Sequence, residues 1–309
     1  MKIVATGLVF FLYTCWLGGC ALFLSMVAGL AVASCRVYIL GAFAAYYSFR
    51  YLVPKQAWPA FLEFFQNVSA KHPYFKAQAV HFEVSEVASA KATKTLFAFH
   101  PHGAVGGGWL VNGIISQAFS ACKNHWLVFD ALMKVPLTGD VFTWLRIDGA
   151  GKATFLRLMA QEKNIALIPG GFEEATTFEH GVHRVYLQKR KGFIKLALVH
   201  GYQVVPVYSF GEEFTVRSYG GFAALRVWLN RFKIPSALFI GQWFCFYLPK
   251  NDLAMHTVVG PPLVLPTIPT PSNADVQKYH QLYIDALVGL FNRHKAAFAA
   301  DPNATLQVL

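Results

Sequence analysis

The sequence contains few cysteines, and their placement argues against a scaffold built on disulfides. Five cysteines occur, and three of them, Cys15, Cys20 and Cys35, lie in an apolar N-terminal region. Small secreted domains depend on dense, paired cysteines, whereas chains in a reducing compartment keep free thiols. The sequence also has no CxxC pair and no Cys/His spacing typical of a zinc site. We therefore expect the body of the chain to face a reducing compartment such as the cytosol.

Three widespread catalytic motifs are also missing. The sequence has no G-x-S-x-G nucleophile elbow, no G-x-x-x-x-G-K-[ST] phosphate loop and no strand-linked G-x-G-x-x-G followed by an acidic residue. These absences argue against a serine hydrolase, a P-loop enzyme and a dinucleotide-dependent enzyme.

Charged residues are scarce as well. They make up 14% of the chain, whereas hydrophobic residues make up 55% and Phe alone occurs 28 times. Soluble domains contain about 25% charged residues, so the composition indicates a membrane-associated protein. The charge that is present is mainly positive, with 27 Lys and Arg against 16 Asp and Glu. This excess favours anionic lipid surfaces, nucleic acid or phosphorylated ligands, and in so apolar a chain membranes and phosphates come first.

The longest uncharged stretch is at the N-terminus. Residues 3–35 carry no charge, and after Arg36 a second apolar stretch runs to residue 49. A membrane span needs about 20 apolar residues, and an arginine at mid-bilayer would cost about 2.5–3.5 kcal/mol. We expect a transmembrane helical hairpin over residues 1–50, with basic residues keeping both ends on the cytoplasmic side. A single span and a cleaved secretory signal are the alternatives, although a signal would have a much shorter apolar region.

The composition changes after residue 50. Residues 51–90 mix polar and apolar side chains and contain three prolines, which is typical of an amphipathic connection on a membrane surface. The main domain is expected over residues 91–309. In it, β-rich runs at 94–99, 125–129, 164–168 and 203–210 alternate with helical patterns near 104–118, 151–163 and 191–201. This alternation predicts an α/β fold with a central sheet flanked by helices.

Two more segments belong to the expected fold. Residues 237–248 form an apolar, aromatic run that is too short to cross a bilayer, so we expect a buried strand or an interfacial segment. Ser272 precedes apolar residues at helical spacing, which predicts a capped helix packed on the sheet.

The HPHG segment at residues 100–103 has the clearest chemical character. It follows an apolar run, at the point where a buried strand would open onto a loop, and it carries two imidazoles, His100 and His102. Histidine accepts and returns a proton near neutral pH, and the intervening proline restricts the backbone between the rings. The segment therefore indicates a reaction centre.

The glycines that follow support a catalytic interpretation. An arbitrary HxH pair in a loop is more often satisfied by backbone carbonyls and carries no chemistry. Here Gly103, Gly106 and Gly107 let backbone N–H groups approach a ligand, where they would hold an oxyanion or a phosphate.

A second glycine-rich turn, GGFEE at residues 170–174, follows another apolar run. Gly170 and Gly171 would add backbone N–H groups to the site, and the Glu174 carboxylate can orient a histidine and stabilise its charged form. An ordinary solvated turn is the alternative. Because ligands bind at the carboxyl ends of strands in open α/β sheets, we expect this turn and the histidines to meet at one edge.

A basic cluster lies between residues 184 and 195 and includes Arg190 and Lys191. Such clusters are often solvated faces, but they also bind phosphorylated cofactors or anionic headgroups. The cluster is not interleaved with aromatic residues in the manner of base stacking, so no nucleic-acid partner is expected.

Taken in order, these motifs resemble the type-2 diacylglycerol acyltransferase family, whose members acylate diacylglycerol, monoacylglycerol or wax alcohols. The resemblance runs from about residue 72 to the C-terminus, and the apolar N-terminus resembles the membrane hairpin of that family. The matching segments are FHPHG at 99–103, IDG at 147–149, GGFEE at 170–174, RKGFIKLA at 190–197, VPVYSFGE at 205–212, TVVGPP at 257–262 and the final helix at 279–295.

The resemblance implies a mixed central sheet of the glycerolipid-acyltransferase type and an acyl-CoA-dependent enzyme that esterifies diacylglycerol to triacylglycerol. His102 would be the general base on the acceptor hydroxyl, His100 would position it or substitute for it, and Glu174 would supply the acid. Arg190 and Lys191 would bind the phosphates of CoA. Attack of an alcohol on a thioester needs a base, an oxyanion stabiliser and a water-poor pocket, so no metal and no cofactor beyond the co-substrate acyl-CoA is expected.

The implied partners are acyl-CoA, a lipid alcohol and the bilayer. The implied location is the endoplasmic reticulum membrane, with the main domain facing the cytosol, and also lipid droplets. The sequence is compatible with a homo-oligomer.

Three alternatives stay open from the sequence. Within acyl transfer, the acceptor could instead be a monoacylglycerol or a wax alcohol. A strand that ends in HxH also opens metal-dependent hydrolases, in which His180 and His183 would complete a zinc site. A non-catalytic lipid-droplet protein would use the same membrane hairpin.

Overall fold

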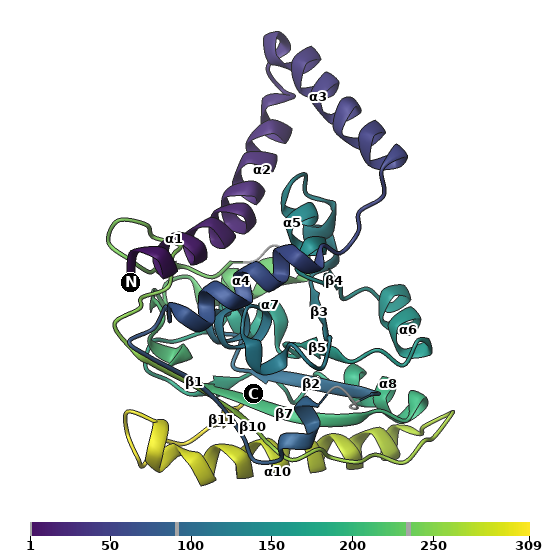
Figure 1. Cartoon of the computed structure of the whole chain (residues 1–309), viewed down its shortest axis with the longest axis vertical. Coiled ribbons are helices and arrows are strands. Elements are labelled where there is room, and N and C mark those ends of the chain that lie inside the picture. Colours follow the sequence, from purple (N-terminus) through teal and green to yellow (C-terminus); the bar gives the residue numbers. More distant parts are fainter. Residues whose placement is uncertain (1, 90–92, 233–235) are drawn as a thin grey trace.

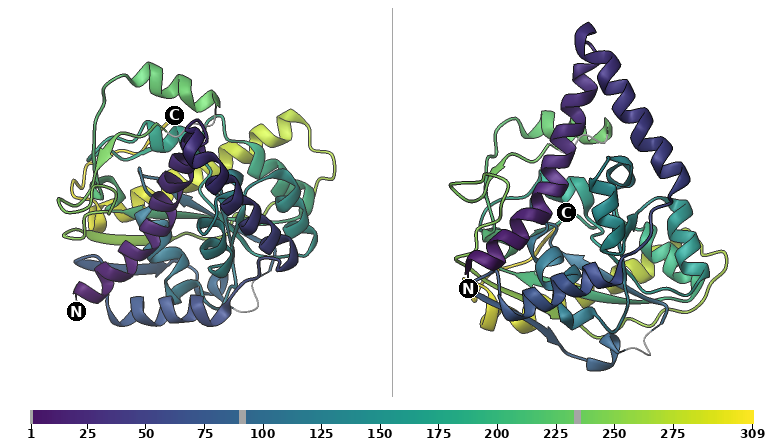
Figure 2. Two further views of the ribbon diagram at one scale, coloured as in Figure 1. Left: turned by 90° about the horizontal axis from the view of Figure 1, so that it is seen from above. Right: turned by 45° about the horizontal axis from the view of Figure 1, so that its top comes forward.

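The N-terminal residues form two long helical arms. The computed structural model describes residues 2–89, 93–232 and 236–309. Helix α1 (Lys2–Tyr13) continues through a π-helical turn (Thr14–Gly18) into α2 (Gly19–Gly29), and α3 (Ala33–Leu52) returns toward the body. Figures 1 and 2 show α2 and α3 projecting from the body as the two arms of a V. The expected helical hairpin is therefore present.

One arm has the character of a membrane span. Among the described residues, Lys2–Gly29 is the one helix that is long and apolar enough to cross a bilayer. Arg36 lies in the first turn of α3, next to the connection between the two arms. Its guanidinium donates a hydrogen bond to the Leu30 carbonyl at 2.9 Å. The first part of this candidate span also contacts the body, since Val9 and Tyr13 of α1 are buried in the core.

A seven-stranded mixed sheet forms the centre of the body. Its strand order is β1-β10-β7-β2-β5-β3-β4, in which β10 runs antiparallel to β7 and all other neighbours are parallel. The four predicted strands are confirmed as β2, β3, β5 and β7, with each end within one residue of the expected one. The strands are β1 (Ala77–Phe82), β2 (Thr95–His100), β3 (His125–Val128), β4 (Ile147–Gly149), β5 (Ile165–Leu167), β7 (Gln203–Phe210) and β10 (Ala254–Val259).

Both faces of the sheet are covered, which explains why its central strands are apolar throughout. Along β2, Phe97 and Phe99 point into the core beneath α1 and α4, whereas Leu96 and Ala98 point into the core beneath α8 and α10. Figure 1 shows α10 running along one side of the sheet and α4 crossing on the other. The remaining helices are α4 (Pro59–Lys71), α5 (Thr138–Trp144), α6 (Lys152–Ala160), α7 (Gly171–Thr176), α8 (Gly192–His200), α9 (Ala223–Leu229) and α10 (Asn273–Phe298).

Helix α10 confirms the predicted C-terminal helix and its cap. The Ser272 hydroxyl accepts a hydrogen bond from the Asp275 N–H at 3.1 Å, and the Asp275 carboxylate accepts one from the Ser272 N–H at 2.9 Å. This reciprocal capping box satisfies two backbone donors at the start of the helix. Helices α6 and α8 likewise confirm the patterns near 151–163 and 191–201.

Three expected segments differ from the sequence-based prediction. The helix expected at 104–118 is reduced to a short turn that is π-helical over Trp109–Ile114, because its glycines favour helix weakly and pack closely. A Cβ on Gly108, for example, would lie 2.6 Å from the Ser209 hydroxyl. Residues 51–90 contain α4 and the edge strand β1. Residues 237–248 contain only a two-residue strand, β9 (Phe239–Ile240), so the buried strand expected there is wrong, and the interfacial segment stays a prediction.

Small elements complete the fold. Strand β6 pairs with β11, and β8 pairs with β9. These strands and the 3₁₀ turns span Arg184–Val185 (β6), Gln307–Val308 (β11), Arg217–Ser218 (β8), and Ser85–Ala88, Gln117–Phe119, Asp130–Lys134, Glu212–Phe214 and Asn230–Phe232.

Candidate active site

The HPHG segment lies at the carboxyl end of β2, between the ends of two parallel neighbours. Strand β7 flanks β2 on one side, so that His100 pairs with Tyr208, and β5 flanks it on the other. The chain leaves β5 into the turn at 170–174 and leaves β7 into Glu212. The turn at 170–174 and the histidines therefore meet at one edge of the sheet, as predicted, and the turn at Glu212 joins them there.

His100 is enclosed. Its side chain is fully buried, and its Nε2 lies 3.0 Å from the hydroxyl of Tyr283 on α10. Burial lowers the pKa of His100 to about 3, so the ring is neutral at physiological pH. A ring without exposed surface holds the strand end and α10 together, but it offers no path to a substrate hydroxyl.

His102 is placed differently. Its ring is partly exposed, and Nδ1 lies 3.0 Å from the Gly103 carbonyl. A carbonyl can only accept, so Nδ1 carries the proton and Nε2 carries the lone pair. Nε2 makes no hydrogen bond to any described residue, and burial lowers the pKa of the ring. His102 is thus held as a neutral base with a free acceptor nitrogen.

Glu174 contacts His102 through the backbone, which corrects the expected contact with the ring. One carboxylate oxygen accepts a hydrogen bond from the His102 N–H, and the other accepts from the Tyr186 N–H at 2.7 Å. The ring has its own partner in Gly103, so the carboxylate is not needed to fix the tautomer. Burial raises the pKa of Glu174 to about 7. Its role is to fix the main chain that carries His102.

Glu212, a residue outside the expected set, completes the loop. It is fully buried and accepts hydrogen bonds from the Gly107 N–H at 3.0 Å and the Gly108 N–H at 2.6 Å. Gly103 has a φ of +60°, and a Cβ there would lie 2.2 Å from a Glu212 carboxylate oxygen. Any other residue would strain the backbone and clash with this carboxylate, so the position requires glycine. Burial raises the pKa of Glu212 to about 8. Its signal in the sequence is an acidic residue in the turn that follows an apolar strand, the pattern that also pointed to Glu174.

These contacts correct the expected role of the glycine N–H groups. The Gly107 N–H binds a side chain of the protein, and the Gly106 N–H donates to the His102 carbonyl at 3.0 Å. Among the described residues, no hydrogen bond uses the N–H of Gly103, Ala104 or Val105. These three amides are the loop donors left for an oxyanion.

The second glycine turn is tied to the basic cluster. Gly171 has a φ of +58° at the start of α7, and the Gly170 carbonyl accepts a hydrogen bond from Arg190 at 3.3 Å. Arg190 also forms an ion pair with Glu173, and Lys191 donates to Gln277 on α10. The structure therefore brings Arg190 next to the site but pairs it with an acid, and it directs Lys191 toward α10.

The other histidines do not join the HPHG pair. His180 Nδ1 lies 2.7 Å from the Val216 carbonyl, and His183 Nδ1 lies 3.0 Å from the Tyr208 hydroxyl. In the part of the chain that the structure describes, no three His, Cys, Asp or Glu side chains are grouped so that they could hold a metal ion. The zinc site considered for an HxH hydrolase is therefore not assembled from these residues.

The first helix reaches the same loop. Tyr13, at the end of α1, is fully buried, and its hydroxyl donates to the Val105 carbonyl at 3.0 Å. The arm that carries the candidate membrane span is thus bonded directly to the segment that follows His102. No local sequence pattern signals this contact, because the two residues are 92 positions apart.

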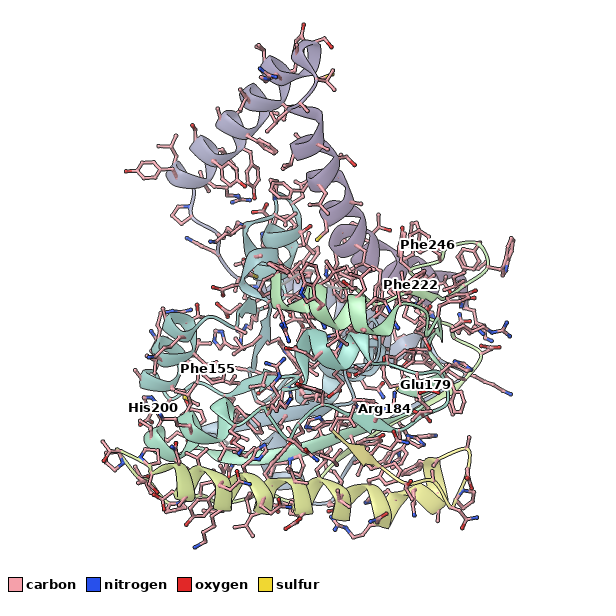
Figure 3. All side chains as sticks on the ribbon, turned by 180° about the vertical axis from the view of Figure 1, so that it is seen from behind. Phe155, Glu179, Arg184, His200, Phe222 and Phe246 are labelled. Carbon is pink, nitrogen blue, oxygen red and sulfur yellow. The ribbon has the colours of Figure 1, made fainter. Side chains whose placement is uncertain are left out.

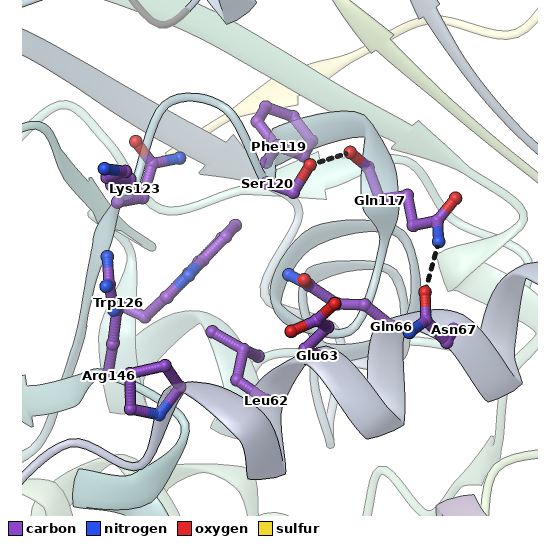
Figure 4. A pocket seen from close by; sticks show the side chains of 12 residues that line it. Leu62, Glu63, Gln66, Asn67, Gln117, Phe119, Ser120, Lys123, Trp126 and Arg146 are labelled. Carbon is purple, nitrogen blue, oxygen red and sulfur yellow. Dashed lines mark hydrogen bonds between the residues drawn. The ribbon is translucent and has the colours of Figure 1, made fainter.

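A cleft of about 540 Å³ lies away from the histidines, between α4 and the start of β3. Figure 4 shows Glu63 and Gln66 of α4 on one side of it and Lys123, Trp126 and Arg146 around the other. No expected catalytic residue lines this cleft, so it is separate from the histidine loop.

Comparison with known proteins identifies relatives of the chain. A family model described as diacylglycerol acyltransferase matches residues 32–309. Diacylglycerol O-acyltransferase 2 of Dictyostelium discoideum is 33% identical over 231 residues, which cover 69% of this chain and 69% of that protein. Acyl-CoA wax alcohol acyltransferase 2 of Mus musculus is 31% identical over 212 residues, covering 63% and 62%.

Among solved structures, the 1-acyl-sn-glycerophosphate acyltransferase of Thermotoga maritima aligns with 97% of this chain and 100% of its own, with a TM-score of 0.47 and 14% identity. The family match rests instead on the sequence, where the matched region includes the histidine loop, both glutamate turns and α10. The chain therefore belongs to the diacylglycerol acyltransferase family and is an acyltransferase.

Proposed function

We propose that the protein transfers an acyl group from acyl-CoA to the free hydroxyl of diacylglycerol, with His102 as the general base. The observation that supports this most directly is the state of the His102 ring. Its Nδ1 proton is committed to the Gly103 carbonyl, and Nε2 is neutral and free among the described residues. A base of this kind near neutral pH is what attack by an alcohol requires.

In the proposed step, Nε2 takes the proton of the acceptor hydroxyl while its oxygen bonds to the thioester carbonyl carbon. The carbonyl oxygen becomes an oxyanion, for which the N–H groups of Gly103, Ala104 and Val105 are the candidate donors. Collapse of the tetrahedral intermediate breaks the C–S bond. The CoA sulfur leaves and takes the proton from Nε2, which restores the neutral ring. No cofactor beyond acyl-CoA enters this sequence of steps.

The surrounding residues act by positioning. Glu174 and Glu212 fix the backbone on the two sides of the histidine loop, and Tyr283 fixes His100 at the strand end. Arg190 is the candidate for the CoA phosphates, which would compete with Glu173 for its guanidinium. Lys191, which contacts α10, is the second candidate.

The acceptor can be assigned by expressing the chain in cells unable to make storage lipid and supplying a fatty alcohol. Triacylglycerol is the expected product, in line with the diacylglycerol acyltransferase relative. Wax ester would instead support the second candidate function, suggested by the relative named as a wax alcohol acyltransferase at 31% identity. Absence of any neutral lipid would refute acyl transfer and favour a non-catalytic lipid-droplet protein.

The His102→Ala variant tests the base directly. We expect its rate of acyl transfer to fall about 10²–10⁴-fold, the range that positioned general bases contribute. His294→Ala, on α10 and paired with Glu83, is the matched control and should keep the wild-type rate. A His102→Ala enzyme as fast as wild type would remove His102 from the mechanism.

The proposed location is the endoplasmic reticulum membrane and lipid droplets, with the body in the cytosol. Protease protection of microsomes would check the orientation. A cytosolic body is cleaved in intact microsomes, whereas a lumenal body is cleaved only after the membrane is opened.

A further inference from the structure

The segment from residue 214 to residue 251 exposes large apolar side chains that the acyl-transfer chemistry does not use. Trp243 is 92% exposed, Phe222 is 80% exposed and Phe246 is 64% exposed. Figure 3 shows Phe222 and Phe246 on the same flank of the molecule. Such a concentration of exposed aromatic rings marks an interaction surface.

Helix α9 in this segment is turned with its polar side inward. The Arg226 guanidinium donates a hydrogen bond to the Thr176 carbonyl at 3.2 Å. One helical turn later, the Asn230 side-chain oxygen accepts a hydrogen bond from the Thr176 hydroxyl at 3.1 Å. The opposite side presents Leu225 and Trp228, which are 54% and 49% exposed. A surface helix of a soluble domain has the reverse arrangement, with apolar residues against the body.

The loop that follows α9 lies against the first helical arm. Tyr247 stacks on Phe10 with ring centroids 6.3 Å apart, and its hydroxyl is 2.9 Å from that of Thr14. Asn251 donates to the Thr6 hydroxyl at 3.5 Å. Since these partners belong to the helix Lys2–Gly29, the exposed rings are continuous with the candidate membrane span.

The charge of the segment fits a phospholipid surface. Residues 214–251 contain no Asp or Glu, but they contain five Lys and Arg. Arg226 is turned inward, whereas Arg217 and Arg231 are exposed. Aromatic rings settle at the headgroup level of a bilayer, and cations beside them attract anionic headgroups.

We propose that the surface formed by α9 and residues 239–246, here called the aromatic surface, docks on the headgroup layer of the bilayer that holds the N-terminal helix. The hairpin and the aromatic surface are then two adjoining membrane contacts on one flank of the body. This docking stands independently of the reaction proposed for His102. It also accounts for residues 237–248, whose apolar run is neither a buried strand nor long enough to span.

Photo-crosslinking in the full-length chain tests the proposal. The Trp243→p-benzoylphenylalanine variant is reconstituted in vesicles of phosphatidylcholine and phosphatidylserine, irradiated, and searched for lipid adducts by mass spectrometry. The same substitution at Leu24, exposed on α2, reports the hairpin, and at Gln281, exposed on α10, it reports the far side of the body.

We expect lipid adducts at positions 243 and 24 and none at position 281. Adducts at position 24 without adducts at position 243 would show an inserted hairpin and an undocked surface, which overturns the proposal. Crosslinks from position 243 to a second copy of the chain would overturn it as well, by assigning the surface to dimer formation.

A second measurement separates docking from mere proximity. With the crosslinker at Phe222, the added pair Trp243→Ser and Phe246→Ser should lower the yield of lipid adduct severalfold. Both side chains are exposed, so their loss leaves the core packing intact. Leu282→Ser, on α10, is the control and should not change the yield. An unchanged adduct yield in the paired variant would contradict the proposal.

Discussion

The protonation state of His102 sets the pH range in which this proposed base can work. Burial lowers the pKa of its ring below the usual value near 6.5, so the neutral form persists to more acidic pH. We expect kcat/KM to stay level through neutral pH and to fall only below pH 6.5, as the ring becomes protonated. A pH–rate profile on reconstituted enzyme checks this, and an acidic limb centred above 6.5 would contradict it.

Glu174 can be tested as a positioning residue by Glu174→Gln. An amide nitrogen cannot accept the N–H of His102 or Tyr186, so one of the two buried bonds is lost at a cost of about 1–3 kcal/mol. We expect a lower kcat and a lower melting temperature, with the KM for acyl-CoA unchanged. Steady-state kinetics and thermal unfolding measure both effects.

The control for that variant is Glu173→Gln, which loses a partly exposed ion pair with Arg190 and should leave the melting temperature nearly unchanged. If Glu174→Gln moved the acidic limb of the pH–rate profile and spared the melting temperature, Glu174 would act on the ring instead of the backbone.

At the scale of elements, α1 begins the candidate membrane span and also contacts the loop of the candidate site. Tyr13→Phe removes the hydroxyl that holds the Val105 carbonyl, a bond worth about 0.5–1.5 kcal/mol. We expect kcat to fall while membrane attachment stays intact. Tyr47→Phe, which loses a bond to the Lys134 carbonyl near the surface, is the matched control and should keep full activity. Equal activities of the two variants would mean that α1 serves only as an anchor.

Elements defined by local pattern were predictable from the sequence. Strands β2 and β7 read as apolar runs because both of their faces are buried, and α10 has helical spacing with a serine cap. The histidine loop and the Glu174 turn were found because each follows such a strand. The contacts among them could not be found this way: Glu212 meets Gly107 across 105 residues, and long-range pairing leaves no local periodicity.

Secondary structure was predicted least well where packing overrides propensity. The turn at Trp109–Ile114 is short because Gly108 fits against Ser209. In the aromatic run at 237–248, Trp243 and Phe246 are exposed instead of buried in a strand. Strand β1 was missed within residues 51–90, since an edge strand is defined by its partner more than by its own sequence.

At the scale of the whole molecule, buried carboxyls set the pH dependence of stability. Burial raises the pKa of Glu174 and Glu213 to about 7 and that of Glu212 to about 8. The folded chain therefore binds more protons than the unfolded chain between their ordinary pKa near 4.5 and these values, so stability falls as pH rises through this range. His100 has the opposite sign, because its lowered pKa costs stability only as pH falls below 6.5.

We therefore expect the melting temperature to fall between pH 6.5 and pH 8.5. Glu212→Gln, which cannot ionise, should show a smaller fall over the same interval. Thermal unfolding in a buffer series measures both, and a melting temperature that rises with pH in wild type would contradict the assignment.

The place of β1 in the sheet also bears on how the chain is made. Its neighbour is β10, to which it pairs from Ala77 with Ala254 through Phe82 with Val259. At about 5–20 residues per second, translation delivers β10 on the order of ten seconds or more after β1. The hairpin leaves the ribosome first and can enter the membrane during that interval. A nascent chain halted before residue 254 would thus present a complete helical hairpin joined to a sheet that still lacks the partner of its first strand.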